Sequence, residues 1–294
     1  MQEVTVRVPA STTNLGPGFD ALGLALALHN RMTFRVTDGP TRVQVEGEGQ
    51  DRLEAGPENL VYQAVERLCR AVDRPAPALE IRLRNAIPVS RGLGSSSTAI
   101  VGGLVGANAL LGEPLDQDGL LALAAEMEGH PDNVAAAIRG GFVVCADDAP
   151  VRFDPTPGLE GVIVTPPQQV ATAEARAALP KEVPIGDAVH NASHVALLIL
   201  GLAGGDLDLV ARGLDDRIHQ PRRAHLYPRS MELVARARDL GAIGATISGA
   251  GPTVLFWSHW DATAGLVQRL HEEAPDCDVQ RVQFQPAGAD VREL

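Results

Sequence analysis

The sequence has 294 residues, a formal net charge of −12 and 45% hydrophobic residues, which allows one large or two ordinary domains with packed cores. This acidic balance, without a basic block, argues against a nucleic-acid partner, because phosphate backbones are bound by clustered cationic side chains. No uninterrupted apolar run is long enough to span a bilayer, and the first residues lack the basic and apolar parts of a signal peptide. We therefore expect a cytoplasmic protein without a membrane partner.

The first half of the chain predicts short strands that alternate with helices. β-branched or alternating apolar residues predict strands at 4–8, 32–37, 42–46, 79–84 and 142–146. Apolar residues at helical spacing predict helices at 57–72, 95–111, 116–128 and 131–138. Asp116 is the expected N-cap of the third helix, because its carboxylate can accept a free N–H group of the first turn.

The second half alternates in the same irregular way. Strands are expected at 162–166, 243–248, 253–257 and 279–284, and helices at 172–179, 188–203, 231–240 and 262–273. The polar, proline-bearing stretch 147–159 separates the halves, and a boundary within 154–159 gives domains 1–156 and 157–294. Strand–helix alternation without regular βαβ spacing predicts an α+β fold with antiparallel sheets.

A glycine- and serine-rich loop at 88–98 is the most informative stretch, with the sequence Pro-Val-Ser-Arg-Gly-Leu-Gly-Ser-Ser-Ser-Thr. Its glycines allow close backbone approach, and its serines open a helix with N–H groups and hydroxyls that favour an anion. It is not a Walker A loop, since no lysine follows its last glycine, and it lacks the third glycine of the dinucleotide fingerprint. We predict a phosphate cradle for a nucleotide, and a plain helix-capping turn is the alternative.

Three further segments could carry chemistry. Residues 126–133, Glu-Met-Glu-Gly-His-Pro-Asp-Asn, gather four ionisable side chains and an amide at a helix break. Because Mg²⁺ takes one or two carboxylates together with substrate phosphates, a glutamate here could hold that ion; a solvated helix end is the alternative. Residues 10–20 predict a turn that exposes Asn14 and Asp20. The glycine-rich turn 247–253 is by itself a plain hairpin, but beside the first loop it suggests backbone closing over a nucleotide.

Two other groups have plainer interpretations. His190 and His194 lie four residues apart on a predicted helix, but without the glutamate of a His-Glu-x-x-His arrangement we interpret them as structural. The charged run 215–223 is by default a surface patch, although one of its arginines could grip a carboxylate bidentately.

Three of these motifs together resemble one family, the GHMP kinases: the loop Pro-x-x-x-Gly-Leu-Gly-Ser-Ser-Ser, the segment Glu-Gly-His-Pro-Asp-Asn and the turn Ser-Gly-Ala-Gly-Pro. The opening run 8–23 and the run Asp-Arg-Ile-His-Gln-Pro at 216–221 resemble the members of that family that phosphorylate L-homoserine. The resemblance extends from about residue 4 to residue 257, which is most of the chain.

The resemblance implies a fold, a reaction and partners. The fold would be α+β in two domains, the first like ribosomal protein S5 domain 2 and the second ferredoxin-like. The reaction would be ATP-dependent, Mg²⁺-assisted phosphorylation of the L-homoserine hydroxyl to O-phospho-L-homoserine, in threonine biosynthesis. A GHMP kinase of the mevalonate or shikimate type is the alternative, and relatives are often homodimers.

The resemblance also implies which residues bind ATP and the metal. The phosphates would lie in the loop formed by Pro88, Val89, Ser90, Arg91, Gly92, Leu93, Gly94, Ser95, Ser96, Ser97 and Thr98. The adenine would be bordered by Asn59, Leu60 and Val61. Mg²⁺ would be held by Ser96 and Glu128, and Glu126 is the alternative glutamate.

The amino-acid substrate would be bound by residues from both halves. Asn14 would meet it, Asp20 would pair with its ammonium, and His130 and Asn133 would line the same pocket. Its carboxylate would be gripped by Arg176 and Arg223, with Arg222 as the alternative arginine. The catalytic residues implied are Ser96, Glu128 and Asn14. Kinases such as mevalonate kinase use an aspartate base, whereas here no carboxylate need deprotonate the hydroxyl, so we expect Asp20 to be a recognition residue.

Overall fold

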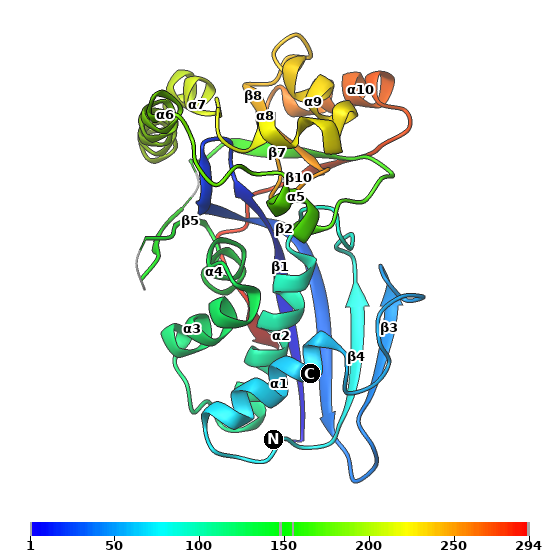
Figure 1. Cartoon of the computed structure of the whole chain (residues 1–294). Coiled ribbons are helices and arrows are strands. Elements are labelled where there is room, and N and C mark those ends of the chain that lie inside the picture. Colours follow the sequence, from blue (N-terminus) through cyan, green and yellow to red (C-terminus); the bar gives the residue numbers. More distant parts are fainter. Residues whose placement is uncertain (1, 147–148, 155, 293–294) are drawn as a thin grey trace.

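The computed structural model describes residues 2–146, 149–154 and 156–292, and it shows two sheets, each covered by helices (Figure 1). Within these residues the first sheet has seven strands in the order β11-β1-β2-β4-β3, with β5 pairing β2 and β6 pairing β5. The strands are β1 (Glu3–Asn14), β2 (Gly18–Val36), β3 (Arg42–Gly47), β4 (Leu79–Asn85), β5 (Phe142–Val144), β6 (Val151–Phe153) and β11 (Asp290–Arg292).

Four helices pack together against the first sheet, with α2 and α4 directly on β1 and β2. They are α1 (Leu60–Ala71), α2 (Ser95–Leu110), α3 (Gln117–Glu128) and α4 (Asp132–Arg139). Local chemistry sets where they begin. The side chain of Asn59 accepts the N–H of Val61 at the start of α1. The carboxylate of Asp116 accepts the N–H of Gly119 at the start of α3, which confirms the expected N-cap.

The second sheet has four antiparallel strands in the order β10-β7-β9-β8. These are β7 (Leu159–Thr165), β8 (Gly244–Ile247), β9 (Val254–His259) and β10 (Asp278–Val282), with α10 (Thr263–Glu273) between the last two. Helices also separate β7 from β8, so the sequence of elements is β-α-β-β-α-β, as the ferredoxin-like expectation requires. The other helices of this half are α5 (Thr172–Ala177), α6 (Ile185–Gly204), α7 (Leu207–Gly213), α8 (Gln220–Arg223) and α9 (Pro228–Ala235).

Three apolar clusters form the core. One fills the space between the first sheet and its helices, and another lies between the second sheet and the helices α9 and α10. The third joins the halves, because Leu24 and Leu26 of β2 lie in it with Leu255 and Trp257 of β9. Burial of apolar surface therefore holds the two sheets together as well as each sheet to its helices.

The strand β2 corrects the sequence prediction. We expected a strand over 4–8, a turn over 10–20 and no further strand before residue 32, but β1 continues to Asn14 and β2 begins at Gly18. In the middle of β2, Ala25 faces the first core cluster while Leu24 and Leu26 face the third. A strand buried on both faces loses the polar–apolar alternation by which strands are recognised, which explains the error.

The segment after β10 returns to the first sheet, which affects the predicted division into domains. The change from the first sheet to the second falls between β6 and β7, where the boundary at 156/157 was placed; residues 147, 148 and 155 of that region lie outside the described residues. After β10, however, Phe284 bridges to Leu26, and β11 pairs antiparallel with β1. The last described residues therefore belong to the first sheet, although the predicted division assigns them to the second domain.

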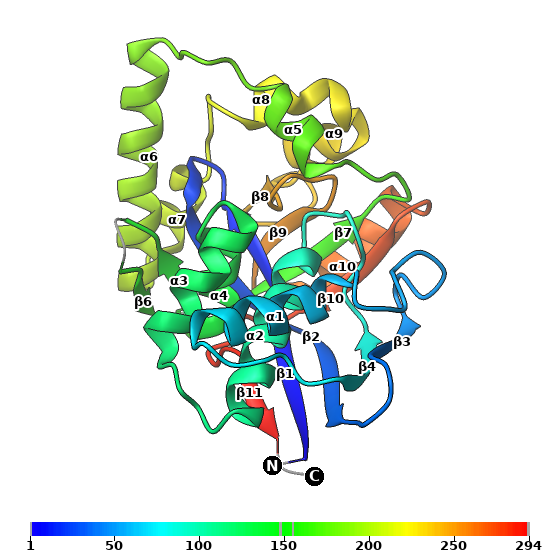
Figure 2. The ribbon, with the colours of Figure 1, turned by 60° about the horizontal axis from the view of Figure 1, so that its bottom comes forward.

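The helix α6 stands at the outer edge of the molecule, against α7 (Figure 2). In the described part of the chain, it is one helix that is long and apolar enough to cross a membrane by length and composition alone. That observation is weak evidence for a span. The N-terminal half of α6 also carries Asp187, His190, Asn191 and His194, side chains that are costly to place in hydrocarbon.

Candidate active site

A cavity of about 430 Å³ lies where segments of both halves meet. Its wall combines the β1–β2 turn, the loop before α2, the α3–α4 junction, α5, α8 and the turn at 249–250. The structure thus brings together all four segments that the sequence singled out for chemistry, together with one arginine of the charged run. A concave pocket with convergent polar groups is the expected form of a ligand site.

The predicted phosphate cradle is the N-terminus of α2. Gly94 caps the helix with a left-handed φ of 71°, and its carbonyl accepts the N–H of Thr98 at 2.8 Å. In the described part of the chain, the N–H groups of Ser95, Ser96 and Ser97 have no acceptor, as is general for a first helical turn. A Cβ on residue 94 would lie 2.2 Å from Oγ of Ser11, so only glycine fits. These features give an anion site at a helix start.

The second glycine-rich turn closes against the first. Ser248 Oγ donates to the carbonyl of Gly92 at 2.6 Å, and a Cβ on Gly92 would lie 2.1 Å from the carbonyl oxygen of Ser248. The same turn is fastened to the first strand, because the N–H of Gly249 donates to the carbonyl of Thr13 at 3.2 Å. The glycines are therefore required for two backbones to touch beside the cavity.

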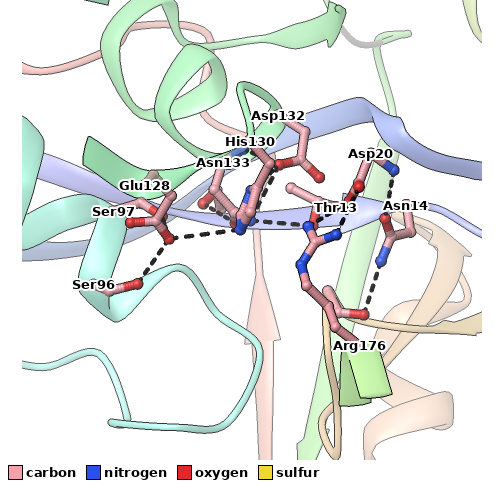
Figure 3. A network of polar contacts seen from close by, with 12 residues as sticks. Thr13, Asn14, Asp20, Ser96, Ser97, Glu128, His130, Asp132, Asn133 and Arg176 are labelled. Atoms are coloured by element: carbon pink, nitrogen blue, oxygen red, sulfur yellow. Dashed lines mark hydrogen bonds and ion pairs between the residues drawn. The ribbon is translucent and has the colours of Figure 1, made fainter. Parts of the chain in front are cut away.

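Glu128 faces the cradle from the end of α3. Its Oε1 accepts the hydroxyls of Ser96 at 2.8 Å and Ser97 at 2.9 Å (Figure 3). The side chain is only 10% exposed and lines the cavity. Glu126 points elsewhere: it is 63% exposed and forms an ion pair with Arg67 at 2.6 Å. Of the two candidate glutamates, Glu128 is therefore the one placed among oxygen donors beside the cradle, as a hard divalent cation needs.

The α3–α4 junction adds a linked set of polar groups (Figure 3). His130 Nδ1 donates to Oδ1 of Asp132 at 2.7 Å, and Nε2 lies 3.9 Å from Oε1 of Glu128. The hydrogen bond to Asp132 raises the pKa of His130 above its ordinary value, against the effect of burial. Asp132 lines the cavity and is 1% exposed, yet the sequence analysis gave it no role. Its place beside the helix break was the available sign.

Asn133 and Asn14 tie the cavity wall together. Asn133 Oδ1 accepts the hydroxyl of Ser11 at 2.7 Å, and its Nδ2 donates to Oγ1 of Thr13 at 3.3 Å. Asn14 Nδ2 donates to the carbonyl of Gly249 at 2.8 Å, and its Oδ1 accepts the N–H of residue 20 at 3.0 Å. Both amides line the cavity and both hold its walls in register, so each contributes structure as well as polar surface to the site.

Asp20 and Arg176 form a bidentate ion pair, with Nη1 and Nη2 each 2.9 Å from a carboxylate oxygen (Figure 3). The sequence analysis expected these groups to meet the ammonium and the carboxylate of a substrate separately. In the structure they satisfy each other. The hydrogen bonds to Asp20 raise the pKa of Arg176, so the guanidinium keeps its charge at neutral pH.

Arg223 and Arg222 differ sharply in environment. Arg223 is 2% exposed and lines the cavity, and its Nε donates to the carbonyl of Ala175 at 2.7 Å. Among the described residues its Nη1 has no hydrogen-bond partner. Arg222 is 39% exposed and lies 3.5 Å from Asp187, outside the cavity. A buried guanidinium without a counter-ion on one nitrogen is a site for an anion.

An aromatic ring that the sequence analysis missed supports both cavity arginines. The guanidinium carbon of Arg176 lies 5.7 Å from the ring centre of Phe19, and that of Arg223 lies 5.2 Å from it. Cation–π contacts of this kind hold two like charges near one point. The charged run 215–223 is accordingly not a surface patch throughout, since Asp216, His219 and Gln220 are buried beside Arg223.

Comparisons with known proteins identify the family. The GHMP kinases N-terminal domain matches residues 59–141, and the GHMP kinases C-terminal domain matches residues 196–275. A homoserine kinase from Synechococcus sp. (strain WH7803) is 46% identical over 277 residues, which cover 92% of this chain and 88% of that protein. The chain belongs to the homoserine kinase family of GHMP kinases.

Other members agree with this placement. A homoserine kinase from Moorella thermoacetica is 46% identical over 254 residues, which cover 85% of this chain and 86% of that protein. The crystal structure of a homoserine kinase from Cytophaga hutchinsonii has a TM-score of 0.90 at 30% identity, over 99% of this chain and 98% of that one. The structure of Methanococcus jannaschii mevalonate kinase, at 14% identity and a TM-score of 0.74, shows the shared GHMP fold alone.

Membership of this family makes the chain an ATP-dependent kinase, and the expected α+β GHMP fold is confirmed. Most of the residues predicted to bind ATP line the cavity, Asn59, Leu60 and Val61 among them. Pro88, Leu93 and Thr98 do not. Leu93 is fully buried in the third core cluster, and Thr98 Oγ1 accepts Nδ2 of Asn30 at 3.1 Å behind the wall.

Proposed function

We propose that this chain transfers the γ-phosphoryl group of ATP to the side-chain hydroxyl of L-homoserine, giving O-phospho-L-homoserine for threonine synthesis. The observation that carries the proposal is the charge layout of the cavity. One region offers a helix N-terminus beside a glutamate, as a triphosphate with a cation needs. Another offers one carboxylate and two guanidinium groups, Asp20 with Arg176 and Arg223, as a zwitterionic amino acid needs.

The nucleotide end follows from the cradle. We infer that the free N–H groups of Ser95, Ser96 and Ser97 bind the ATP phosphates, while residues 59–61 border the base. Glu128 Oε1 and the hydroxyl of Ser96 fit a hard cation, and we assign Mg²⁺ to them. The ion supplies charge neutralisation on the triphosphate when it is bound.

The part of the cavity that holds Asp20, Arg176 and Arg223 suits a substrate with an amine. We infer that the ammonium takes the place of Arg176 on Asp20, and that the carboxylate binds Arg176 and Nη1 of Arg223, an atom that has no hydrogen-bond partner within the described residues. A mevalonate- or shikimate-type substrate carries a carboxylate but no amine, so it would leave Asp20 without a cation. The layout therefore favours homoserine over these alternatives.

The chemistry needs positioning more than a base. Phosphoryl transfer passes through a loose transition state, so aligning the hydroxyl with the γ-phosphorus and neutralising charge carry most of the catalysis. Asn14, His130 and Asn133 are placed to orient the substrate, since all three line the cavity. Asp20 is held in an ion pair, which supports recognition rather than proton abstraction.

A coupled assay of ADP release tests the proposal with L-homoserine, mevalonate, shikimate and galactose as acceptors and ATP with Mg²⁺ held saturating. We expect turnover with homoserine at least about a hundredfold above the other acceptors in kcat/KM, because they leave a charged group of the site unpaired. Equal or greater turnover with mevalonate or shikimate would remove the substrate assignment. The cytoplasmic location, the homodimer and the domain division stay predictions.

A further inference from the structure

A cluster of three metal-ligating side chains lies outside the active-site cavity. His190 and His194 project from α6, and Asp215 follows α7 two residues after its end. One potential ligand atom from each residue lies within 4.8 Å of the other two. The cluster is separate from the cavity, whose lining contains none of the three. The sequence analysis interpreted the two histidines as structural because the glutamate of a His-Glu-x-x-His arrangement is missing. The third side chain, Asp215, comes instead from another segment of the chain.

A hydrogen bond orients the ring of His194. Its Nδ1 lies 2.7 Å from the main-chain carbonyl oxygen of His190. A carbonyl only accepts, so Nδ1 carries a hydrogen, and Nε2 is the nitrogen available to a metal ion. Metal-binding histidines commonly donate their second nitrogen to a carbonyl in this way, which sets the tautomer and orients the ring.

The two imidazole rings lie side by side. They stack with centroids 3.7 Å apart and planes inclined by 22°, and each ring places a potential ligand nitrogen in the cluster. Neutral imidazole is the form that binds metal.

His190 lacks a proper partner for its second nitrogen. Its Nε2 is buried and, within the described residues, makes no hydrogen bond, although Oδ2 of Asp215 lies 3.1 Å away. A ring nitrogen and a carboxylate oxygen this close together need a proton or a metal ion between them. A proton would give a plain ion pair between His190 and Asp215. A metal ion would be bound by His194 as well.

We propose that His190, His194 and Asp215 bind a borderline divalent ion of the Zn²⁺ class. Two imidazoles and one carboxylate are a donor set that suits Zn²⁺ and Ni²⁺, whereas Mg²⁺ prefers oxygen donors. Bonds of about 2.0–2.2 Å require the three side chains to draw together around the ion, and a fourth position stays open to water. Asp215 is 66% exposed, so an ion can enter from solvent.

Binding would fasten α6 to the segment that leads into α8. The neighbours of two ligands already touch, because Asn191 Nδ2 donates to Oδ1 of Asp216 at 2.8 Å and to the carbonyl of Pro17 at 3.1 Å. A bound ion would add a second link beside this one. We therefore expect Zn²⁺ to raise the unfolding temperature, since an ion that binds only the folded chain stabilises it.

Calorimetric titration of the full chain, stripped of metal by a chelator and kept in excess Mg²⁺, tests the proposal with Zn²⁺ alone as the probe. Wild type should bind one equivalent and gain thermal stability. His194→Ala and Asp215→Asn should each weaken binding at least about tenfold, as loss of a ligand does. The exposed controls His225→Ala and Asp208→Asn should leave it unchanged. Glu128→Gln should also bind normally, which separates this site from the active site.

Co²⁺ provides a second readout. Bound to this donor set it should give visible ligand-field absorption that His194→Ala and Asp215→Asn alter and the two control variants do not. If wild type and His194→Ala bind Zn²⁺ with the same affinity, the cluster is an ion pair alone and the proposal is wrong. Equal loss of binding in Glu128→Gln would assign the metal to the active site instead.

Discussion

Arg223 offers the sharpest test of the amino-acid site, because Arg222 beside it is a matched control. We expect Arg223→Met to raise the KM for homoserine strongly and to leave the KM for ATP unchanged. The fold should tolerate the change, since methionine keeps the apolar stem and removes a buried charge whose Nη1, among the described residues, has no partner. Arg222→Met removes an exposed charge that lies 3.5 Å from Asp187 and does not line the cavity.

The size of the effect follows from burial. Loss of one partner of a buried, hydrogen-bonded charge pair costs about 2–5 kcal/mol. At about 1.4 kcal/mol per tenfold, that corresponds to about 30-fold to about 4,000-fold in KM. Arg223 is 2% exposed, which places it in this class. An exposed ion pair such as that of Arg222 is worth at most about 1 kcal/mol, or about fivefold.

The assay is steady-state kinetics with ATP saturating, homoserine varied, and thermal unfolding measured on the same preparations. A small change in KM for Arg223→Met, or an equal change for Arg222→Met, would refute the assignment of Arg223 to the carboxylate. A fall in unfolding temperature large enough to leave the enzyme unfolded under assay conditions would instead show that the buried guanidinium stabilises the fold, contrary to the argument above.

Three further results are expected. Asp20→Asn should raise the KM for homoserine far more than it lowers kcat, and the opposite pattern would make Asp20 a base. Glu128→Gln should lower kcat by about 10²-fold or more with an unchanged circular dichroism spectrum, while Glu126→Gln stays near wild type; normal turnover in Glu128→Gln would contradict the metal assignment. Asp132→Asn should lower the pKa of His130, read from the NMR titration of its ring protons. Because the folded-state pKa of His130 is raised, the stability gained from this pair is complete below about pH 6.5. That stability is lost as pH rises through the folded-state pKa. The variant should therefore be less stable than wild type mainly at acidic pH.

The sequence predicted what local chemistry determines. The cap at Asp116 and the glycine loop before α2 depend on residues that are neighbours in the chain, so they could be recognised without the fold. The middle of β2 could not, because its burial on both faces arises from two separate core clusters. The charged run before α8 looked like a surface for the same reason: only the packed structure shows which of its side chains are covered.

The residues of the site also fall into those that the sequence identified and those that it missed. Motif residues such as Ser96 and Glu128 could be named from the sequence, because a motif preserves the order of its members; both line the cavity, and their metal role stays a prediction. Phe19 and Asp132 act through partners that the fold supplies, namely two arginines for the ring and His130 for the carboxylate. A chain read alone carries no sign of such partnerships unless the residue type itself is unusual.

The Asp20–Arg176 pair gives the active site a means of selecting zwitterions. The pair is about one-third exposed on each side, so opening it costs at most about 1 kcal/mol. A ligand with both charges restores each bond that it breaks. A carboxylate without an amine gives Arg176 a new partner but leaves Asp20 without a cation, so the free energy lost on opening the pair is not recovered. A preference for zwitterions therefore follows from the ion pair itself, without any clash against the wrong substrate.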